Sequence, residues 1–217
     1  MTTELPPPIP AATVIIVRDG TDALEVLLLK RSAVGAFPGM WVFPGGRVDA
    51  TDHGDNEFEQ AQHAAAREVH EEVGLVVPAD SLVTWAHWTP PPQQPKRFNT
   101  WFFVATWTGQ PVVIDEHEIV DHVWLEPATA LQQGLPIAPP TFVTLHQLAD
   151  FTGVDELAGG PRRGVERFAT KHAVDGDDTY LLWHGDSGYE LGDHSLAGDR
   201  HRARMTKGRI RSYDRTA

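Results

Sequence analysis

The sequence predicts an α/β (α+β) fold in which helices pack on a mixed β-sheet. Three observations carry this prediction. Two apolar, β-branched runs open the chain, a long run of helix-forming residues follows, and shorter strand and helix patterns then alternate. The length of 217 residues suits one large domain with an extension. We place a lead-in at residues 1–10, the main domain at residues 11–151 and a C-terminal extension at residues 152–217.

The first elements follow from local pattern. ATVIIVRDG and LEVLLLKRS predict the two strands of a β-hairpin, because the turn residues DGTDA separate them. A loop with a short strand from Met40 to Phe43 follows. The run EFEQAQHAAAREVHEEVG predicts a long helix that ends at Gly74, since glycine suits a C-cap. LVTWAHWTP and RFNTWFFVATWTG predict two strands around a proline-rich loop, and VWLEP predicts another.

The rest of the chain predicts a mixture of helices and strands. ATALQQG and TFVTLHQLADF are typical of helices. After Phe151 a loose connector leads to VERFATKH, which predicts a short helix, and then to the strand pattern TYLLWHGD. RHRARMTKGRIRSY predicts a hairpin around TKG, and we expect this two-faced hairpin to cover the main domain. Its arginines, which alternate with apolar residues, are Arg202, Arg204, Arg209 and Arg211.

Composition excludes several kinds of protein. The chain has no cysteine, which excludes disulfides, a thiolate nucleophile and cysteine-ligated zinc. The net charge of -12 argues against nucleic acid as a partner. No apolar run reaches the roughly 20 residues that span a membrane, and the first residues lack the features of a signal peptide. We therefore expect a cytoplasmic protein that binds neither nucleic acid nor membrane, although metal ions would let it bind an anionic substrate.

Three glutamates crowd one face of the predicted long helix. Glu68, Glu71 and Glu72 follow the spacing i, i+3, i+4, which places side chains side by side at a cost of a few tenths of a kcal/mol per like-charged pair. A solvated acidic face is one explanation. A Mg²⁺ site is the other, because Mg²⁺ binds a few carboxylates together with substrate phosphates. Arg67, directly before the cluster, is placed to hold one carboxylate in position.

The segment REVHEEVGL resembles the second half of the Nudix box, which reads Gly, five residues, Glu, seven residues, then Arg-Glu-apolar-any-Glu-Glu-any-Gly-apolar. All seven fixed positions from Arg67 to Leu75 match, and FPGG resembles the segment that precedes the box. The resemblance implies a Nudix-type α/β/α sandwich with a small C-terminal β-rich extension. It also implies hydrolysis of a nucleoside diphosphate derivative with Mg²⁺ or Mn²⁺. The metal ligands that it implies are Glu68, Glu71, Glu72 and Gly46.

A general base is also needed, or a metal-bound hydroxide in its place. Glu118, in the predicted loop DEHEIVDHVW, is our first candidate, either as the base or as a further metal ligand. Asp115 and Glu116 are its rivals in the same loop, and Glu71 or Glu72 is the alternative within the box. The catalytic set that we expect is Glu68, Glu71, Glu72, Arg67 and Glu118.

The first half of the box departs from the pattern. Gly46 lies 21 residues before Arg67, which is seven more than the pattern has. Counting forward from Gly46 places the first acidic residue at Asp52, whereas counting backward from Arg67 places it at Glu59. Glu59 also suits a capping box with Asn56. We prefer Glu59 for the site, and we expect the extra residues around DHGDNEF to bulge outward as an exposed turn.

The segment LLLKRSAVGAFPGMWVFPGG resembles the Nudix branch that cleaves coenzyme A and acyl-CoA, although an arginine expected between RS and FPGG is missing. The resemblance implies the products 3′,5′-ADP and (acyl-)phosphopantetheine, and a homodimer. The alternatives are an ADP-ribose or NADH pyrophosphatase and a Nudix domain that only senses a nucleotide. The substrate-binding candidates are Arg31 and the Phe43-Pro44 pair. Further phosphate-contact candidates are Lys96 and Arg97.

Overall fold

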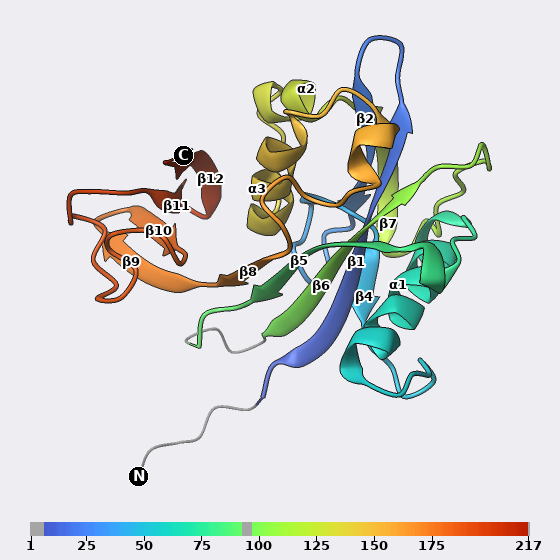
Figure 1. Ribbon diagram of the computed structural model, residues 1–217, viewed down its shortest axis with the longest axis horizontal. Helices are drawn as coiled ribbons and strands as arrows, with labels where there is room; N and C mark the ends of the chain where they lie inside the picture. Colours follow the sequence, from blue (N-terminus) through green and yellow to red (C-terminus); the bar gives the residue numbers. More distant parts are fainter. Residues whose placement is uncertain (1–6, 93–96, 217) are drawn as a thin grey trace.

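The computed structural model describes residues 7–92 and 97–216. Within these residues, eight strands form a mixed sheet with helices on both faces, and Figure 1 shows α1 on one side of it and α2 and α3 on the other. The strands are β1 (Ile9–Asp19), β2 (Leu24–Arg31), β3 (Trp41–Val42), β4 (Gly45–Arg47), β5 (Val83–Thr89), β6 (Phe98–Thr106), β7 (Ile119–Leu125) and β8 (Glu166–Ala169). The helices are α1 (Glu57–Val73), α2 (Pro127–Gln132) and α3 (Pro139–Leu148), with short 3₁₀ turns at Ala79–Ser81 and Val154–Leu157.

The order of strands in this sheet is β3-β2-β1-β6-β5-β8, with β4 paired to β1 and β7 paired to β2. The predicted hairpin is confirmed, since β1 and β2 pair antiparallel with Val17 opposite Val26. β1 and β6 pair in parallel along nine residues, as do β5 and β8 along four. The sheet is therefore mixed, as expected.

The central strand β1 supplies core residues to both faces, because successive side chains of a strand point to opposite sides. Val14 and Ile16 belong to the apolar cluster that includes Val69 of α1. Ile15 and Val17 belong to the cluster that includes Val143 and other residues of α3. This alternation gives the predicted three-layer α/β/α arrangement.

The ends of α1 follow the sequence signals. The Asn56 side chain accepts a hydrogen bond from the Glu59 backbone N–H at 3.0 Å, which makes Asn56 the N-cap. Gly74 ends the helix at φ 70°, a conformation that glycine adopts without strain. The predicted end of this helix is confirmed.

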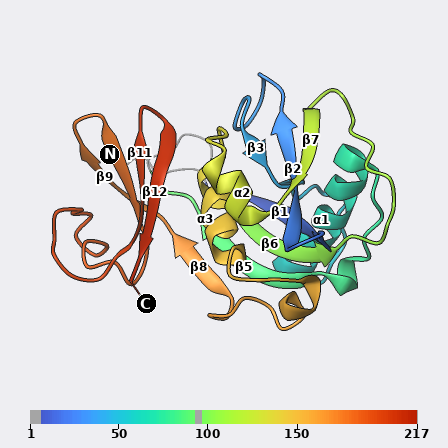
Figure 2. The same ribbon diagram turned by 90° about the horizontal axis from the view of Figure 1, so that it is seen from above.

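The C-terminal strands form a second, antiparallel sheet in the order β12-β11-β10-β9. β12 contacts α3, and Figure 2 shows the second sheet beside that helix. The predicted hairpin around TKG is confirmed, and Lys207 and Gly208 both have positive φ, as its tight turn requires. The strands are β9 (Lys171–Asp175), β10 (Asp178–Leu182), β11 (His201–Thr206) and β12 (Arg209–Arg215).

The helix predicted for VERFATKH is wrong, because this segment forms β8 and the start of β9. Phe168 of β8 stacks on Trp88 of β5 with ring centroids 3.9 Å apart and planes 3° apart. β8 also pairs with the edge of β5. Packing against this edge therefore overrides the helix-forming residues of the segment.

Arg202 differs from the other hairpin arginines. It is buried, and its Nε donates to the Asp186 carboxylate at 2.6 Å. The apolar neighbours Ala203 and Met205 contribute to the main core or pack against it. Arg202 therefore forms an internal ion pair, whereas Arg204 and Arg209 are exposed.

At the N-terminal side, the described structure differs from the expected lead-in at one point. β1 begins at Ile9, so the boundary that we expected after residue 10 falls inside a strand. In the described residues, no helix combines the length and the apolar character that crossing a bilayer requires.

Candidate active site

Two glutamates of α1 lie on the glycine pair of β4. Glu72 is the more buried of the two, with 6% of its side chain exposed, and it accepts a hydrogen bond from the Gly45 N–H at 2.8 Å. A Cβ atom on Gly46 would lie 2.4 Å from the Glu68 carboxyl group. Because only glycine leaves this space free, Gly46 lets α1 bring Glu68 directly against the strand.

The Arg67 side chain binds Glu68 and a third glutamate of α1, Glu71. Its Nη1 donates to Glu68 and to Glu71, both at 2.9 Å. Its Nε and Nη2 donate to the two oxygens of Asp52 at 3.0 and 2.9 Å. Such a bidentate pair fixes the plane of the guanidinium. Asp52 therefore orients Arg67, and Arg67 in turn orients two carboxylates of the box.

Our preference for Glu59 over Asp52 is corrected by this geometry. Glu59 accepts hydrogen bonds from the Asp55 N–H and the Asn56 side chain, each at 2.9 Å, at the start of α1. It caps the helix and does not approach Arg67. The forward count from Gly46, which gave Asp52, was the sequence signal for the residue that pairs with Arg67.

The middle of the extra segment forms an exposed turn, as expected, whereas Asp52 at its start is buried and Glu57 and Phe58 at its end begin α1. His53, Asp55 and Asn56 are exposed, whereas the Asp52 side chain is only 4% exposed. Burial raises the pKa of Asp52, but the hydrogen bonds from Arg67 and the Asp49 backbone outweigh it and hold the pKa below its ordinary value. The ionised Asp52 carboxylate therefore pairs with Arg67, and the exposed turn begins at the next residue, His53.

Arg31 joins this cluster from the end of β2. Its Nη2 donates to Glu118 at 2.7 Å, and its Nη1 lies 3.4 Å from the Glu72 carboxylate. The pairing of β2 with β7 shifts register between Lys30 and Arg31. Such bulges re-aim side chains beside functional sites. Arg31 thus lies between a carboxylate of α1 and one of the loop before β7.

The loop acids have separate positions. Asp115 accepts hydrogen bonds from the N–H groups of Glu118 and Ile119 at 3.0 and 2.9 Å, so its carboxylate closes the turn. Glu116 occupies a left-handed conformation in that turn, with φ 60°. Glu118 is the loop acid whose side chain reaches the cluster, and its side chain is 65% exposed.

The cluster carries more negative charge than its buried setting favours. Burial raises the pKa of Glu72 to about 8, against the Gly45 hydrogen bond and Arg31, which lower it. Glu68 and Glu118 raise it further by like-charge repulsion. Burial also raises the pKa of Glu68, although Arg67 opposes this. Added positive charge would therefore stabilise the ionised site.

The oxygen donors of this cluster suit a hard divalent cation, which prefers carboxylate and carbonyl ligands. Among the described residues, no group of three or more acidic or histidine side chains has the arrangement of a metal site. Arg31 and Arg67 bind carboxylate oxygens that would serve as ligands. The chemistry of the donors fits, and those two arginines would have to share or release them.

The remaining substrate-binding candidates lie elsewhere. Phe43 is 3% exposed and belongs to the core, so we remove it from the set that contacts substrate. The Pro44 carbonyl accepts a hydrogen bond from the Val14 N–H at 2.9 Å, which anchors the glycine pair. The Arg97 carbonyl accepts from the Ile9 N–H at 2.7 Å. Lys96 lies outside the described residues.

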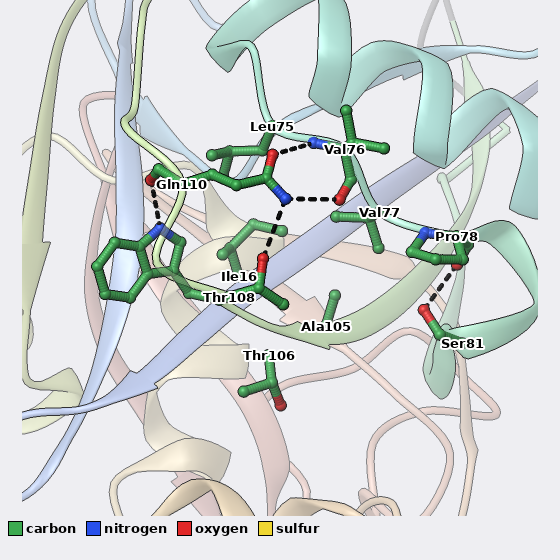
Figure 3. A pocket seen from close by; sticks show the side chains of 11 residues that line it. Ile16, Leu75, Val76, Val77, Pro78, Ser81, Ala105, Thr106, Thr108 and Gln110 are labelled. Atoms are coloured by element: carbon green, nitrogen blue, oxygen red, sulfur yellow. Dashed lines mark hydrogen bonds between the residues drawn. The ribbon is translucent and has the colours of Figure 1, made fainter.

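A cavity of about 370 Å³ opens beside residues 75–78, which follow α1 (Figure 3), and no carboxylate of the cluster lines it. The residues that line it carry no acidic or basic side chain. Gln110 bridges the backbone N–H and carbonyl of Val76, as the dashed lines show. This cavity lacks groups for phosphoryl chemistry, and the carboxylate cluster is the candidate active site.

The sequence matches the model of the NUDIX domain family over residues 7–145. It is 28% identical over 168 residues to the putative nudix hydrolase 7 of Caenorhabditis elegans, covering 58% of this chain and 56% of that protein. It is also 28% identical over 122 residues to the acyl-coenzyme A diphosphatase NUDT19 of Xenopus laevis, covering 46% of this chain and 32% of that protein. The alignments thus span about half or less of these relatives.

Solved structures show the same fold. The NUDIX hydrolase from Alicyclobacillus acidocaldarius superposes with a TM-score of 0.62 at 23% identity, covering 73% of this chain and 97% of that one. The MutT NUDIX hydrolase from Burkholderia pseudomallei gives a TM-score of 0.53 at 21% identity, with 66% and 99% covered. From the family match and the geometry of its box, we conclude that the chain belongs to the Nudix domain family.

Proposed function

We propose that this protein is a divalent-metal-dependent hydrolase that cleaves the diphosphate bond of a nucleoside diphosphate derivative. One observation carries the proposal. Glu68 and Glu72 of α1 and Glu118 of the loop before β7 gather around Gly45–Gly46 and Arg31. Nudix enzymes generally use divalent metals, and this set of oxygen donors suits Mg²⁺ or Mn²⁺.

The proposed ion would be held by Glu68, Glu71 and Glu72 with the backbone of Gly46. When bound, the ion would neutralise the charge of the diphosphate and activate the attacking water. Arg67 keeps Glu68 and Glu71 in one orientation through its two hydrogen bonds. Preorganised ligands of this kind avoid reorganisation during the reaction.

Glu118 is the best-placed acceptor for the proton of the attacking water. Its side chain is exposed and can meet a water molecule, whereas that of Glu72 is only 6% exposed and already accepts from Gly45. As the water oxygen bonds to phosphorus, its proton passes to the Glu118 carboxylate and the bond to the bridging oxygen breaks. Asp115 fixes the backbone of Glu118 for this role.

Coenzyme A or acyl-CoA is the substrate that we propose, with 3′,5′-ADP and (acyl-)phosphopantetheine as products. The resemblance of the LLLKRS…FPGG segment to the coenzyme A branch supports it, as does the similarity to the acyl-coenzyme A diphosphatase of Xenopus laevis. A dinucleotide such as ADP-ribose or NADH is the alternative. The Nudix domain of Shewanella oneidensis NrtR, solved with ADP ribose, shares the fold at 20% identity. This identity supports a common fold but not a common ligand.

The test is a substrate panel of coenzyme A, acyl-CoAs, ADP-ribose, NADH and diadenosine polyphosphates, each with Mg²⁺ and with Mn²⁺. We expect release of 3′,5′-ADP from coenzyme A derivatives, and loss of at least about 100-fold in kcat for Glu72→Gln. Glu59→Gln is the matched control, because it changes a glutamate of the same helix that only caps it. Turnover of ADP-ribose or NADH alone would move the substrate to the alternative.

Failure to hydrolyse any member of the panel would contradict the proposed activity and favour a nucleotide sensor. The homodimer and the cytoplasmic location that the resemblance and composition suggest remain part of the proposal. Light scattering of the purified protein tests the dimer, and fractionation of the cells that make it tests the location.

A further inference from the structure

Arg31 connects the two parts of the chain that supply the candidate catalytic carboxylates. Glu72 lies on α1, and Glu118 lies in the loop before β7, 46 residues later in the sequence. The Arg31 guanidinium bonds to both through different nitrogens, at 3.4 and 2.7 Å. The same side chain therefore sets the separation of these two carboxylates.

The contacts of Arg31 show which face of the sheet its side chain takes. Leu27 and Leu29 face the apolar cluster under α1, and after the register shift at Lys30 the Arg31 side chain also lies on that side, where it reaches Glu72 of α1. Its side chain is 13% exposed, although it ends beside an exposed glutamate. An arginine so buried has lost most of its freedom to follow a ligand in solution.

The donors of Arg31 are already directed at protein groups. Nη1 and Nη2 are directed at Glu72 and Glu118, and Nε is buried with no hydrogen-bond partner among the described residues. A residue that clamps a diphosphate would instead present two adjacent N–H groups to the ligand. These hydrogen bonds thus favour the carboxylates over the substrate as the partners of Arg31.

The backbone next to Arg31 holds the Glu118 loop as well. The Ser32 N–H donates to the Glu118 carbonyl at 2.8 Å, so backbone and side chain of adjacent residues bind the same glutamate. The side chain of Glu118 is 65% exposed, and its hydrogen bond to Arg31 is what directs it toward α1.

We propose that Arg31 is a positioning residue, which holds the Glu118 carboxylate against Glu72, and not a contact to the substrate diphosphate. The inference rests on the proposed function for the role of Glu118, but the arrangement itself can be tested without turnover. It replaces our expectation from the sequence that Arg31 binds substrate.

The experiment compares Arg31→Met with Arg31→Lys and with the control Lys30→Met. Lys30 carries the same charge on the same strand, but its side chain points to the other face of the sheet. The readouts are Mn²⁺ affinity by electron paramagnetic resonance, hydrogen exchange of the Glu118 and Ile119 amides, and kcat and KM separately. Urea unfolding verifies that each variant is folded.

For Arg31→Met we expect Mn²⁺ affinity to fall about 10-fold or more, as when a partner of a metal ligand is lost. We expect faster exchange of the two amides and a lower kcat, with KM within about twofold of the parent protein. Arg31→Lys should restore part of the affinity, because one ammonium group pairs with one carboxylate at a time. Added to Glu118→Gln, Arg31→Met should lower kcat little further.

A rise in KM with kcat, Mn²⁺ affinity and amide exchange unchanged would overturn the inference and return Arg31 to the substrate. So would equal effects of Lys30→Met and Arg31→Met. If the parent protein hydrolyses none of the panel, the proposed function fails, whereas Mn²⁺ affinity and amide exchange still decide the role of Arg31.

Discussion

Replacement of Glu72 by glutamine tests the charge of the site through protein stability. Burial raises the pKa of Glu72 from 4.5 to about 8 in the folded protein. The native state then holds this proton more tightly than the unfolded chain. The free energy of unfolding is therefore unaffected by Glu72 below about pH 4.5, falls as pH rises toward 8, and is constant above it.

The magnitude follows from the same pKa. Each pH unit between 4.5 and about 8 changes the free energy of unfolding by about 1.4 kcal/mol, which sets an upper limit of about 5 kcal/mol. Glutamine keeps an oxygen for the Gly45 N–H but does not ionise. In EDTA, Glu72→Gln should thus differ from the parent protein by less than about 1 kcal/mol at pH 5 and exceed its stability by about 2–5 kcal/mol at pH 8.5.

Urea unfolding followed by tryptophan fluorescence at pH 5 to 9 measures this difference, with the Glu59→Gln variant as a control. Saturating Mg²⁺ should raise the stability of the parent protein at pH 8.5 and leave Glu72→Gln nearly unchanged, because ligand binding stabilises only the state that binds it. Parallel pH profiles of parent and Glu72→Gln proteins in EDTA would refute the reasoning.

Two further predictions concern the box. Asp52→Asn should lower kcat about 10- to 100-fold by releasing Arg67, whereas Glu59→Gln should leave kcat unchanged and lower the free energy of unfolding by about 0.5–1 kcal/mol through the weaker helix cap. Kinetics and urea unfolding of both variants test this, and the reverse pattern would restore Glu59 to the site. Gly46→Ala should displace the flexible end of Glu68 and lower kcat at least about 100-fold, while the melting temperature changes little; near-normal kcat would show that Glu68 does not need its position on the strand.

The sequence predicted those elements in which local pattern and tertiary packing agree. The β1–β2 hairpin has clear turn residues, and α1 has both caps, so their limits are close to those expected. β8 was missed because its conformation depends on Trp88 and on the edge of β5, which are about 80 residues distant in the chain. Local sequence propensity does not depend on a partner strand so distant in the chain, so it cannot predict this pairing.

The site was predicted to a similar degree. The glutamates of α1 were found because a motif and a helical spacing coincide. Asp52 was passed over because the count backward from Arg67 reaches Glu59, although a capping box already explained that residue, and an insertion cannot be located by counting from one end. The pairing of Arg31 with Glu118 depends on a register shift between β2 and β7, which no local pattern encodes.

The place of β8 in the large sheet has a consequence for what counts as a folding unit. The family match ends at residue 145, yet β8 pairs with β5 and Phe168 covers Trp88. A chain cut at residue 151 would leave β5 with a row of unpaired backbone groups and bare indole, which invites association with other chains. The matched region therefore completes its sheet with a strand that lies beyond residue 145, so the smallest fragment expected to keep this sheet intact must include β8.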